Sequence, residues 1–213
     1  MRGDRFRDRV EAGELLAQRL GHYRGTDALV LAIPRGGIPV GHVVAKALGL
    51  PLDIVLAKKI GHPANPEFAI GAASPEAVIL DPRFDVDPEY VQEQVASIRA
   101  QMSERAARYR GDRPRPVVEG RTVIVVDDGV ATGHTLLATI DLLRRQGPAR
   151  IVVAMPVVPP DFIENGGGNA DEFIHLIAPE DFRCVGQYYE EFFPVEDEEA
   201  TRLLEDNWRT SPV

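Results

Sequence analysis

Two adjacent carboxylates end an apolar run and precede small and hydroxylic residues in VIVVDDGVATGHT, residues 123–135. Asp127 and Asp128 can accept hydrogen bonds from hydroxyl groups or give oxygen ligands to a divalent metal. The residues after them, 131–135, predict a tight turn that begins a helix, and the free N–H groups at such a helix end bind anions. The stretch therefore predicts a site for a ligand that has hydroxyl groups close to a phosphate, as a phosphorylated sugar has.

Three other origins of this pattern fit less well. A P-loop needs Gly-Lys-Ser/Thr after a longer glycine-bounded loop, and GVATGHT has no lysine. Paired acids also end strands in receiver domains and in NTPases, but neither predicts an immediate Thr-Gly-x-Thr turn. A solvated strand end followed by an ordinary helix cap would not account for so many consecutive positions that fit a phosphate site.

The elements that position these residues alternate along the chain. Short apolar runs bounded by turn residues are typical of strands buried on both faces, and helical spacing lies between them. The expected strands are residues 28–34, 51–59, 121–128 and 149–158, and the expected helices are residues 37–50 and 131–147. This alternation predicts an α/β fold with a mainly parallel central sheet of four or five strands, flanked by helices. Asp127 and Asp128 then lie at the carboxyl end of a strand, where ligands bind in such sheets.

The chain begins with the pattern of an amphipathic helix that packs on the sheet and ends near Gly21. Its expected apolar face consists of Phe6, Val10, Gly13, Ala17 and Leu20. Gly147 is expected to cap the later helix, and the glycine-rich residues 164–171 predict a flexible turn.

Two segments interrupt the alternation. Residues 61–77 are rich in Gly, Pro and Ala, which predicts a long loop or hairpin. The next segment has apolar side chains at helical spacing, with Asp87 as N-cap and Pro88 at the first helical position. We interpret residues 61–115 as a loop and helical insertion within a single domain that spans residues 1–213.

Composition and charge narrow the classes of function. The formal net charge of -9 at pH 7 argues against a nucleic-acid partner, because such surfaces are normally basic. Cys184 is the only cysteine, so no intrachain disulfide forms, and its apolar neighbours predict a core position. Dispersed histidines disfavour a zinc site, and the absence of Gly-x-Ser-x-Gly disfavours a serine hydrolase. Since neither a membrane span nor a signal-peptide pattern is present, we expect a cytoplasmic protein without a membrane partner.

The acid-rich stretch resembles the 5-phosphoribosyl 1-diphosphate (PRPP) motif of type I phosphoribosyltransferases. The motif consists of four apolar residues, two acids, a small residue, Thr132, Gly133, any residue and Thr135. The resemblance implies a type I phosphoribosyltransferase-like fold in which Asp127 and Asp128 hold the ribose 2′- and 3′-hydroxyls. It also implies that the following loop binds the 5′-phosphate through Ala131, Thr132, Gly133, His134 and Thr135. His134 replaces a glycine that is often found there, so we expect it to contribute its backbone.

PRGG, residues 34–37, follows the first expected strand, where the family places a pyrophosphate-binding loop. Arg35 supplies positive charge, while Gly36 and Gly37 permit unusual backbone angles and a close approach to an anion. Many relatives have a non-proline cis peptide here, so we expect one before Arg35.

Lys58 and Lys59 are expected to end the second strand, as a basic pair does in several relatives. The resemblance makes them ligands of the diphosphate and makes residues 61–77 a loop that closes over the substrate, with Asn65 and Glu67 within reach of it. The alternative for both lysines is a solvated strand end, which fits Lys58 better than Lys59, because an acidic protein needs cations at a polyphosphate site.

The resemblance places an acceptor-binding hood in segments specific to each subgroup, here the helix at 88–110 together with residues 179–193. We treat residues 179–213 as a C-terminal hood or tail. Three aromatic side chains there could stack on a planar acceptor, with a core position as the alternative. They are Phe182, Tyr188 and Tyr189, and Tyr188 is the one that we select.

The resemblance implies Mg²⁺-dependent transfer of the phosphoribosyl group from PRPP to a nitrogen of a small-molecule acceptor, with release of pyrophosphate. Asp127 and Asp128 are the metal-ligand candidates, Arg35 and Lys59 stabilise the leaving group, and Asp128 is a candidate base. A regulator that binds PRPP without catalysis and a hydrolase of a phosphorylated sugar are the alternatives. We expect a homodimer, because twofold dimers are the commonest closed assemblies. The identity of the acceptor is not encoded in any motif that we find.

Overall fold

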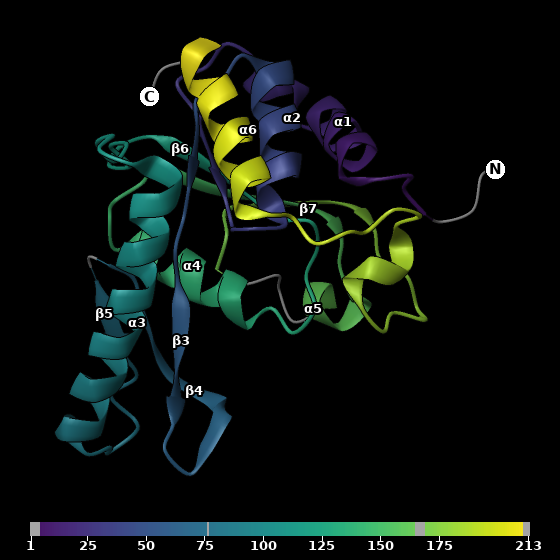
Figure 1. The fold of residues 1–213 in the computed structure, drawn as a ribbon. Coiled ribbons are helices and arrows are strands. Elements are labelled where there is room, and N and C mark those ends of the chain that lie inside the picture. Colours follow the sequence, from purple (N-terminus) through teal and green to yellow (C-terminus); the bar gives the residue numbers. More distant parts are fainter. Residues whose placement is uncertain (1–4, 76, 165–168, 211–213) are drawn as a thin grey trace.

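The computed structural model describes residues 5–75, 77–164 and 169–210, apart from the side chain of Glu67. Five parallel strands form the central sheet in the order β2–β1–β6–β7–β8 (Figure 1). They are β1 (Leu29–Ala32), β2 (Leu52–Ile54), β6 (Thr122–Val126), β7 (Arg150–Val157) and β8 (Glu172–Ile177). The α/β fold with a parallel central sheet, expected from the sequence, is confirmed.

The strand order reverses between β1 and β6, which are neighbours in register from Leu29 opposite Val123 to Ala32 opposite Val126. From β1 the chain moves outward to β2 on one side, and it returns to β6 on the other. The loops that leave these two strands therefore diverge, and a crevice opens between them at the carboxyl edge of the sheet.

Helices cover both faces of the sheet because alternate strand residues point to opposite sides. One face packs on α1 (Arg9–Arg19), α2 (Gly37–Leu48) and α6 (Asp197–Thr210), and the other packs on α4 (His134–Arg144) and α5 (Pro160–Glu164) (Figure 1). Val30 and Ile124 contribute to the first core, whereas Leu29 and Val123 contribute to the second. The continuous apolar runs in the sequence thus reflect burial on both faces.

A second, antiparallel sheet extends away from the central one (Figure 1). It contains β3 (Lys58–His62), β4 (Asn65–Ala73) and β5 (Val78–Leu80), and α3 (Pro88–Arg110) follows it. Ile60 and Ile70 pack with Ile98 and Met102 of α3, while Ala72 packs on α4. We call β3, β4, β5 and α3 the arm.

The arm contains both a confirmed prediction and a wrong one. Asp87 caps α3 by accepting a hydrogen bond from the N–H of Glu89 at 2.9 Å, and Pro88 is the first helical residue, as expected. Residues 51–59 do not form one strand: they are divided between β2 and β3, which belong to different sheets. An apolar run shows that its residues are buried but not which strands they pair with. The break between the two strands at residues 55–57 therefore could not be predicted from the sequence.

The start of the described chain meets the segment before α6 beside the central sheet. Phe6 forms a parallel β-bridge with Tyr189, which follows the short 3-10 helix η2 (Val185–Tyr188). Another 3-10 helix, η1 (Gly21–Tyr23), follows α1. Within α1 the expected apolar face is correct for Gly13 and Ala17, and wrong for Val10, which is exposed.

The predictions for Cys184 and Gly147 can also be compared with the structure. Cys184 is exposed, so its predicted core position is wrong: apolar neighbours in sequence do not fix the direction of a side chain in a loop. Gly147 has a φ of 71°, but it lies beyond Arg145, the residue that caps α4. Part of the expected turn at 164–171 lies outside the described residues. Over the described ranges, no helix is long and apolar enough to cross a membrane.

Candidate active site

Asp127 and Asp128 directly follow β6, and the structure holds Asp128 through its backbone as well as its side chain. The N–H of Asp128 donates to Asp127 Oδ1 at 2.8 Å, and its carbonyl oxygen accepts from the Tyr189 hydroxyl at 2.6 Å. A cavity of about 280 Å³ opens beside the two acids, and Val185 of η2 forms part of its wall. The acids are thus positioned at the edge of a space that could hold a small ligand.

The loop after β1 lies against this acid pair. A Cβ atom added to Gly36 would lie 2.1 Å from Asp128 Oδ2, and one added to Gly37 would lie 2.6 Å from the carbonyl oxygen of Val126. Gly36 has ordinary helical angles, φ −56° and ψ −35°, so the predicted need for unusual angles is wrong there. Close contact with the end of β6 and with the acid that follows it is what requires glycine at both positions. The expected cis peptide between Pro34 and Arg35 is present.

The predicted phosphate loop turns into α4 at the same edge. Gly133 is the N-cap residue with a φ of 74°, and a Cβ atom there would lie 2.2 Å from the Phe162 ring. Ala131, Thr132 and Thr135 are exposed, and α4 has no side-chain hydrogen bond at its N-cap. The first N–H groups of α4 are therefore available to an anion, and its dipole favours negative charge there.

The two adjacent lysines of β3 point to opposite sides of the arm. Lys59 is half-buried, and its Nζ lies 3.4 Å from Nδ1 of His134, in the phosphate loop. Lys58 is exposed and donates to Oε1 of Gln101 on α3 at 3.2 Å. The structure therefore places Lys59 beside the predicted phosphate loop and Lys58 on the other face of β3, because side chains alternate along a strand. The sequence had predicted that both lysines end the second strand of the central sheet. That prediction is wrong, because both lysines begin β3.

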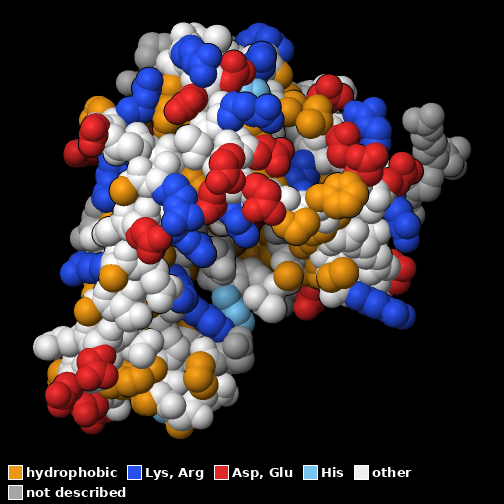
Figure 2. All heavy atoms as spheres, viewed as in Figure 1, with side chains coloured by type: hydrophobic (Ala, Val, Ile, Leu, Met, Phe, Trp, Pro, Cys, Tyr) orange, Lys and Arg blue, Asp and Glu red, His pale blue; other side chains and the backbone are white. Residues whose placement is uncertain are grey.

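Figure 2 shows Lys, Arg and His side chains in the hollow between the arm and the rest of the molecule. Nη1 of Arg35 lies 3.6 Å from Oδ1 of Asp197, the first residue of α6. Asp197 also accepts a hydrogen bond from the Tyr109 hydroxyl at 2.5 Å and forms an ion pair with Arg108. The Tyr109 hydrogen bond, together with Arg108, lowers the pKa of the Asp197 carboxyl. The side chain of Arg35 is thereby linked to both α3 and α6.

Sequence reasoning missed Arg9, the first residue of α1. Its Nε and Nη2 donate to Asp128 Oδ2 at 2.9 and 2.8 Å, and Nη1 donates to the carbonyl oxygen of Phe193 at 2.8 Å. Both side chains of this ion pair are largely buried, with 12% of Arg9 and 14% of Asp128 exposed. An isolated arginine 119 positions from its partner carries no motif that could have revealed it.

A comparison with protein families bears on this geometry. The family model described as "Phosphoribosyl transferase domain" matches residues 8–166, which include both loops, the acid pair and Arg9. The chain belongs to the phosphoribosyltransferase family. The sequence prediction of type I family membership is therefore confirmed.

Individual relatives agree with this assignment. A crystal structure of TT1426 from Thermus thermophilus is 42% identical, with a TM-score of 0.88, and the match covers 95% of this chain and 98% of that one. Two Mycobacterium tuberculosis strains each have a protein whose name includes "Putative phosphoribosyl transferase", 38% identical over 207 residues. These alignments cover 94% of this chain and 46% of the relatives, so the chain spans about half the length of the curated relatives it matches.

The surroundings of the acid pair change the pKa of both carboxyl groups. Burial, followed by the charge of Asp128, raises the pKa of the Asp127 carboxyl well above its usual value. Burial also raises the pKa of the Asp128 carboxyl, while Arg9 acts in the opposite direction. Arg9 is thus the cation that compensates the negative charge at this edge of the sheet.

Two of the three aromatic residues named for the acceptor site, Tyr188 and Tyr189, lie in the core, and Phe182 is half-buried. Tyr188 is 4% exposed, its ring stacks on Phe182 with centroids 5.9 Å apart, and its hydroxyl donates to Asp181 at 3.0 Å. Tyr189 is also buried. The alternative of a core position is therefore the correct one for Tyr188. Residues 179–193 also lie on the opposite side of the molecule from α3 in Figure 1, so the two segments do not form one hood.

The residues of the acid pair fit a magnesium ion that arrives with a ligand's phosphates. Mg²⁺ commonly binds one or two protein carboxylates and completes its coordination with waters and phosphate oxygens. Within residues 5–75, 77–164 and 169–210, no cluster of three or more His, Cys, Asp or Glu side chains could hold a metal. Asp127 and Asp128 thus offer carboxylate oxygens without forming a complete metal cage.

Proposed function

We propose that this protein transfers the phosphoribosyl group of PRPP to a nitrogen of a nucleobase-like acceptor and releases pyrophosphate in a Mg²⁺-dependent reaction. The observation that carries the proposal is the contact between the two loops: the Asp128 carboxylate lies against Gly36, at a strand-order reversal. A sugar held by the acids would therefore lie between the anion-binding end of α4 and the loop that carries Arg35. PRPP has a phosphate on one side of its ribose and a diphosphate on the other, which matches that order.

Each part of the donor has a proposed partner. Asp127 and Asp128 accept the ribose 2′- and 3′-hydroxyls, and the loop of residues 131–135 binds the 5′-phosphate through the N–H groups that begin α4. The loop after β1 binds the diphosphate through Arg35 and the backbone of Gly36 and Gly37. Lys59 contacts His134 of the phosphate loop from the arm and is the second cation proposed for the diphosphate, whereas Lys58 is not included.

In the reaction, the bond between C1 of the ribose and the diphosphate oxygen breaks, and a bond from C1 to the acceptor nitrogen forms. Positive charge grows on the ribose ring, where the carboxylates of Asp127 and Asp128 stabilise it, and negative charge grows on the diphosphate near Arg35 and Lys59. Bound Mg²⁺ would neutralise part of the diphosphate charge. The proton of the acceptor nitrogen goes to a base, for which Asp128 is the candidate; unchanged turnover in Asp128→Asn would exclude that role.

The arm would close over the bound donor and exclude water. β3 and β4 form a hairpin next to the phosphate loop, with Lys59 facing it, which is a suitable position for such closure. Asn65, which begins β4, is at the far end of the hairpin from Lys59, and the side chain of Glu67 lies outside the described residues. We therefore keep only Lys59 as a proposed ligand from this segment.

Calorimetric titration of PRPP with Mg²⁺ tests the proposal. Wild-type protein should bind PRPP, and the Asp127→Asn/Asp128→Asn variant should lose the binding. Glu89→Gln/Glu93→Gln removes the same charge from exposed positions of α3 and serves as the control. No binding to folded wild-type protein would contradict the proposal.

A screen of nucleobases for pyrophosphate release then distinguishes the classes of function. Release that depends on one base identifies the acceptor of a transferase. Release without any base identifies a hydrolase, and binding without release identifies a PRPP-binding regulator.

A further inference from the structure

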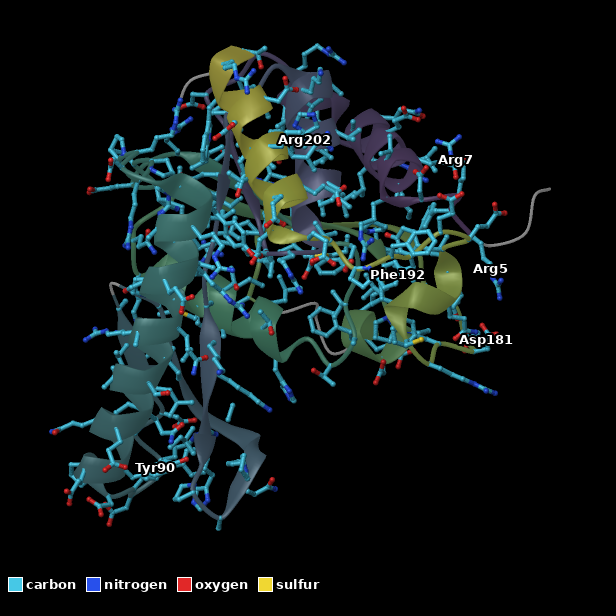
Figure 3. The ribbon with its side chains drawn as sticks, viewed as in Figure 1. Arg5, Arg7, Tyr90, Asp181, Phe192 and Arg202 are labelled. Carbon is cyan, nitrogen blue, oxygen red and sulfur yellow. The ribbon has the colours of Figure 1, made fainter. Side chains whose placement is uncertain are left out.

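Arg9 is fixed on three sides by groups that do not depend on a ligand. Its guanidinium carbon lies 4.0 Å from the centroid of the Phe192 ring, and Nη1 is bound to the carbonyl oxygen of Phe193. Phe192 is half-buried, and in Figure 3 it lies nearer the body of the molecule than Arg5 and Arg7, which are at the margin. The remaining donors, Nε and Nη2, both contact Asp128 Oδ2.

The backbone around Arg9 is held just as firmly. Asp8 caps α1, and the N–H groups of Glu190 and Glu191 donate to the carbonyl oxygens of Phe6 and Arg7, each at 2.8 Å. Because a cation–π contact and a charged hydrogen bond both immobilise the guanidinium, its position relative to Asp128 is preset.

This arrangement changes what the acid pair can bind. Two adjacent, largely buried carboxylates would repel each other and would also repel a polyanion such as PRPP. Arg9 compensates one of the two charges and occupies one oxygen of Asp128, which leaves Oδ1 to accept a hydroxyl. A half-compensated pair is a weaker ligand for a bare divalent cation and a better one for a sugar polyphosphate.

We propose that Arg9 is a positioning residue of the donor site: its guanidinium orients and compensates Asp128 so that the acid pair binds PRPP and resists direct chelation of free Mg²⁺. The assignment of PRPP rests on the proposed function, while the effect on free Mg²⁺ does not. The two ligands are therefore expected to respond to the loss of Arg9 in opposite directions.

The experiment compares three single variants with wild-type protein by calorimetry, using PRPP with Mg²⁺ in one series and Mg²⁺ alone in the other. Arg9→Met removes the charge, Arg9→Lys keeps it, and Arg5→Met makes the same change of net charge at an exposed position. Arg9→Met should bind PRPP about tenfold to a hundredfold more weakly, the range for loss of a charged hydrogen bond. Mg²⁺ alone should bind Arg9→Met at least about threefold more tightly, because the carboxylate charge is no longer compensated.

Arg5→Met should stay within about threefold of wild type in both series, since it keeps Arg9 beside Asp128. Arg9→Lys keeps the charge but loses the planar fork, so its affinity for PRPP should lie between those of wild type and Arg9→Met, and its affinity for Mg²⁺ alone should stay within about threefold of wild type. Equal binding of both ligands by Arg9→Met and Arg5→Met would overturn the proposal, and so would PRPP binding by Arg9→Lys as weak as that of Arg9→Met. A merely structural role of Arg9 would weaken both ligands together, which would also contradict it.

Two further outcomes keep the inference separate from the proposed function. If wild-type protein does not bind PRPP, the proposed function fails, and the Mg²⁺ series alone decides the role of Arg9: tighter binding by Arg9→Met supports it and unchanged binding overturns it. If a thermal melt shows that Arg9→Met is unfolded, Arg9→Gln replaces it, since glutamine keeps an N–H donor for Asp128 and removes the charge.

Discussion

The carboxyl edge of the central sheet and the arm are stabilised in different ways. The edge is built on strands buried on both faces, and its polar groups converge from α1, β1, β6 and the segment after η2. The arm has its own small apolar cluster around Ile60 and Met102 and reaches the site through Lys59. Damage to the edge should therefore abolish ligand binding, whereas damage to the arm away from Lys59 should reduce stability or closure and leave the donor site intact.

The largest effect is expected where the arm joins the core. Arg110, the last residue of α3, forms a buried ion pair with Asp53 of β2, with Nη2 2.9 Å from Oδ1 and Nε 3.1 Å from both oxygens. Arg110→Ala leaves a buried carboxylate without the guanidinium that donates to both of its oxygens, and should lower the free energy of unfolding by about 3–5 kcal/mol. Chemical denaturation measures this, with the exposed Arg99→Ala in the same helix as control. A loss equal to that of the control would show that the ion pair does not secure the arm.

The substitution Gly36→Ala tests the contact between the loop after β1 and Asp128 at the carboxyl edge of the central sheet. The added Cβ would lie 2.1 Å from Asp128 Oδ2, so either the loop or the carboxylate must move. We expect PRPP affinity to fall about a hundredfold, the order found when a positioned group moves by about 1 Å. Gly21→Ala is the matched control, because a Cβ atom added at that position would meet nothing within 4 Å. Wild-type affinity in Gly36→Ala would contradict the contact between the two loops.

The two lysines of β3 allow the two faces of one strand in the arm to be compared. Lys59→Met should weaken PRPP binding about tenfold, since one charged contact to the diphosphate is lost. Lys58→Met makes the same chemical change on the other face of the strand and should change the affinity less than about twofold, as expected for an exposed charge. Calorimetry on the two variants measures the difference, and equal effects would mean that Lys59 contributes only through net charge.

The smallest effects are expected in alkaline solution. Burial, assisted by Asp197, raises the pKa of Tyr109 in the arm to about 12, and burial with Glu172 raises the pKa of Tyr23 beside the central sheet to about 12. Each folded-state pKa exceeds the unfolded value, so the stabilisation is complete below about pH 10 and is lost as pH rises toward about 12. Each tyrosine should cost about 1 kcal/mol of unfolding free energy by about pH 11.

Denaturation at about pH 9 and about pH 11 measures the loss, and Tyr109→Phe and Tyr23→Phe should each remove about half of it. A Phe variant whose stability falls as steeply as that of wild type would show that its tyrosine does not titrate abnormally.

The sequence could predict those parts of the molecule that are local in the chain. Neighbouring residues in the sequence indicate the two acids, the turn at 131–135, and Gly36 with Gly37. The structure brings these groups together because β1 and β6 are adjacent. Arg9 and Tyr189 approach Asp128 from distant segments, so no spacing could indicate them.

The arm shows a second reason for failure. Lys58 and Lys59 are adjacent residues of the same type. Their surroundings differ because adjacent side chains of β3 point to opposite faces of its sheet, and the sequence does not show which face lies toward the site. The prediction for Tyr188 was wrong for a related reason: an aromatic residue can stack on a ligand or pack in the core, and its burial beside Phe182 decides between the two.

The pairing of Phe6 with Tyr189 has a consequence for the order in which the protein folds. The turn at 131–135 is local in sequence and can form early, but the groups that hold Asp128 come from Arg9, 119 positions away, and Tyr189, 61 positions away. Contacts between residues so far apart are costly to close and form late. A refolding experiment should therefore show the circular dichroism of the helices before the capacity to bind PRPP, which should appear only as the segments around Phe6 and Tyr189 pair.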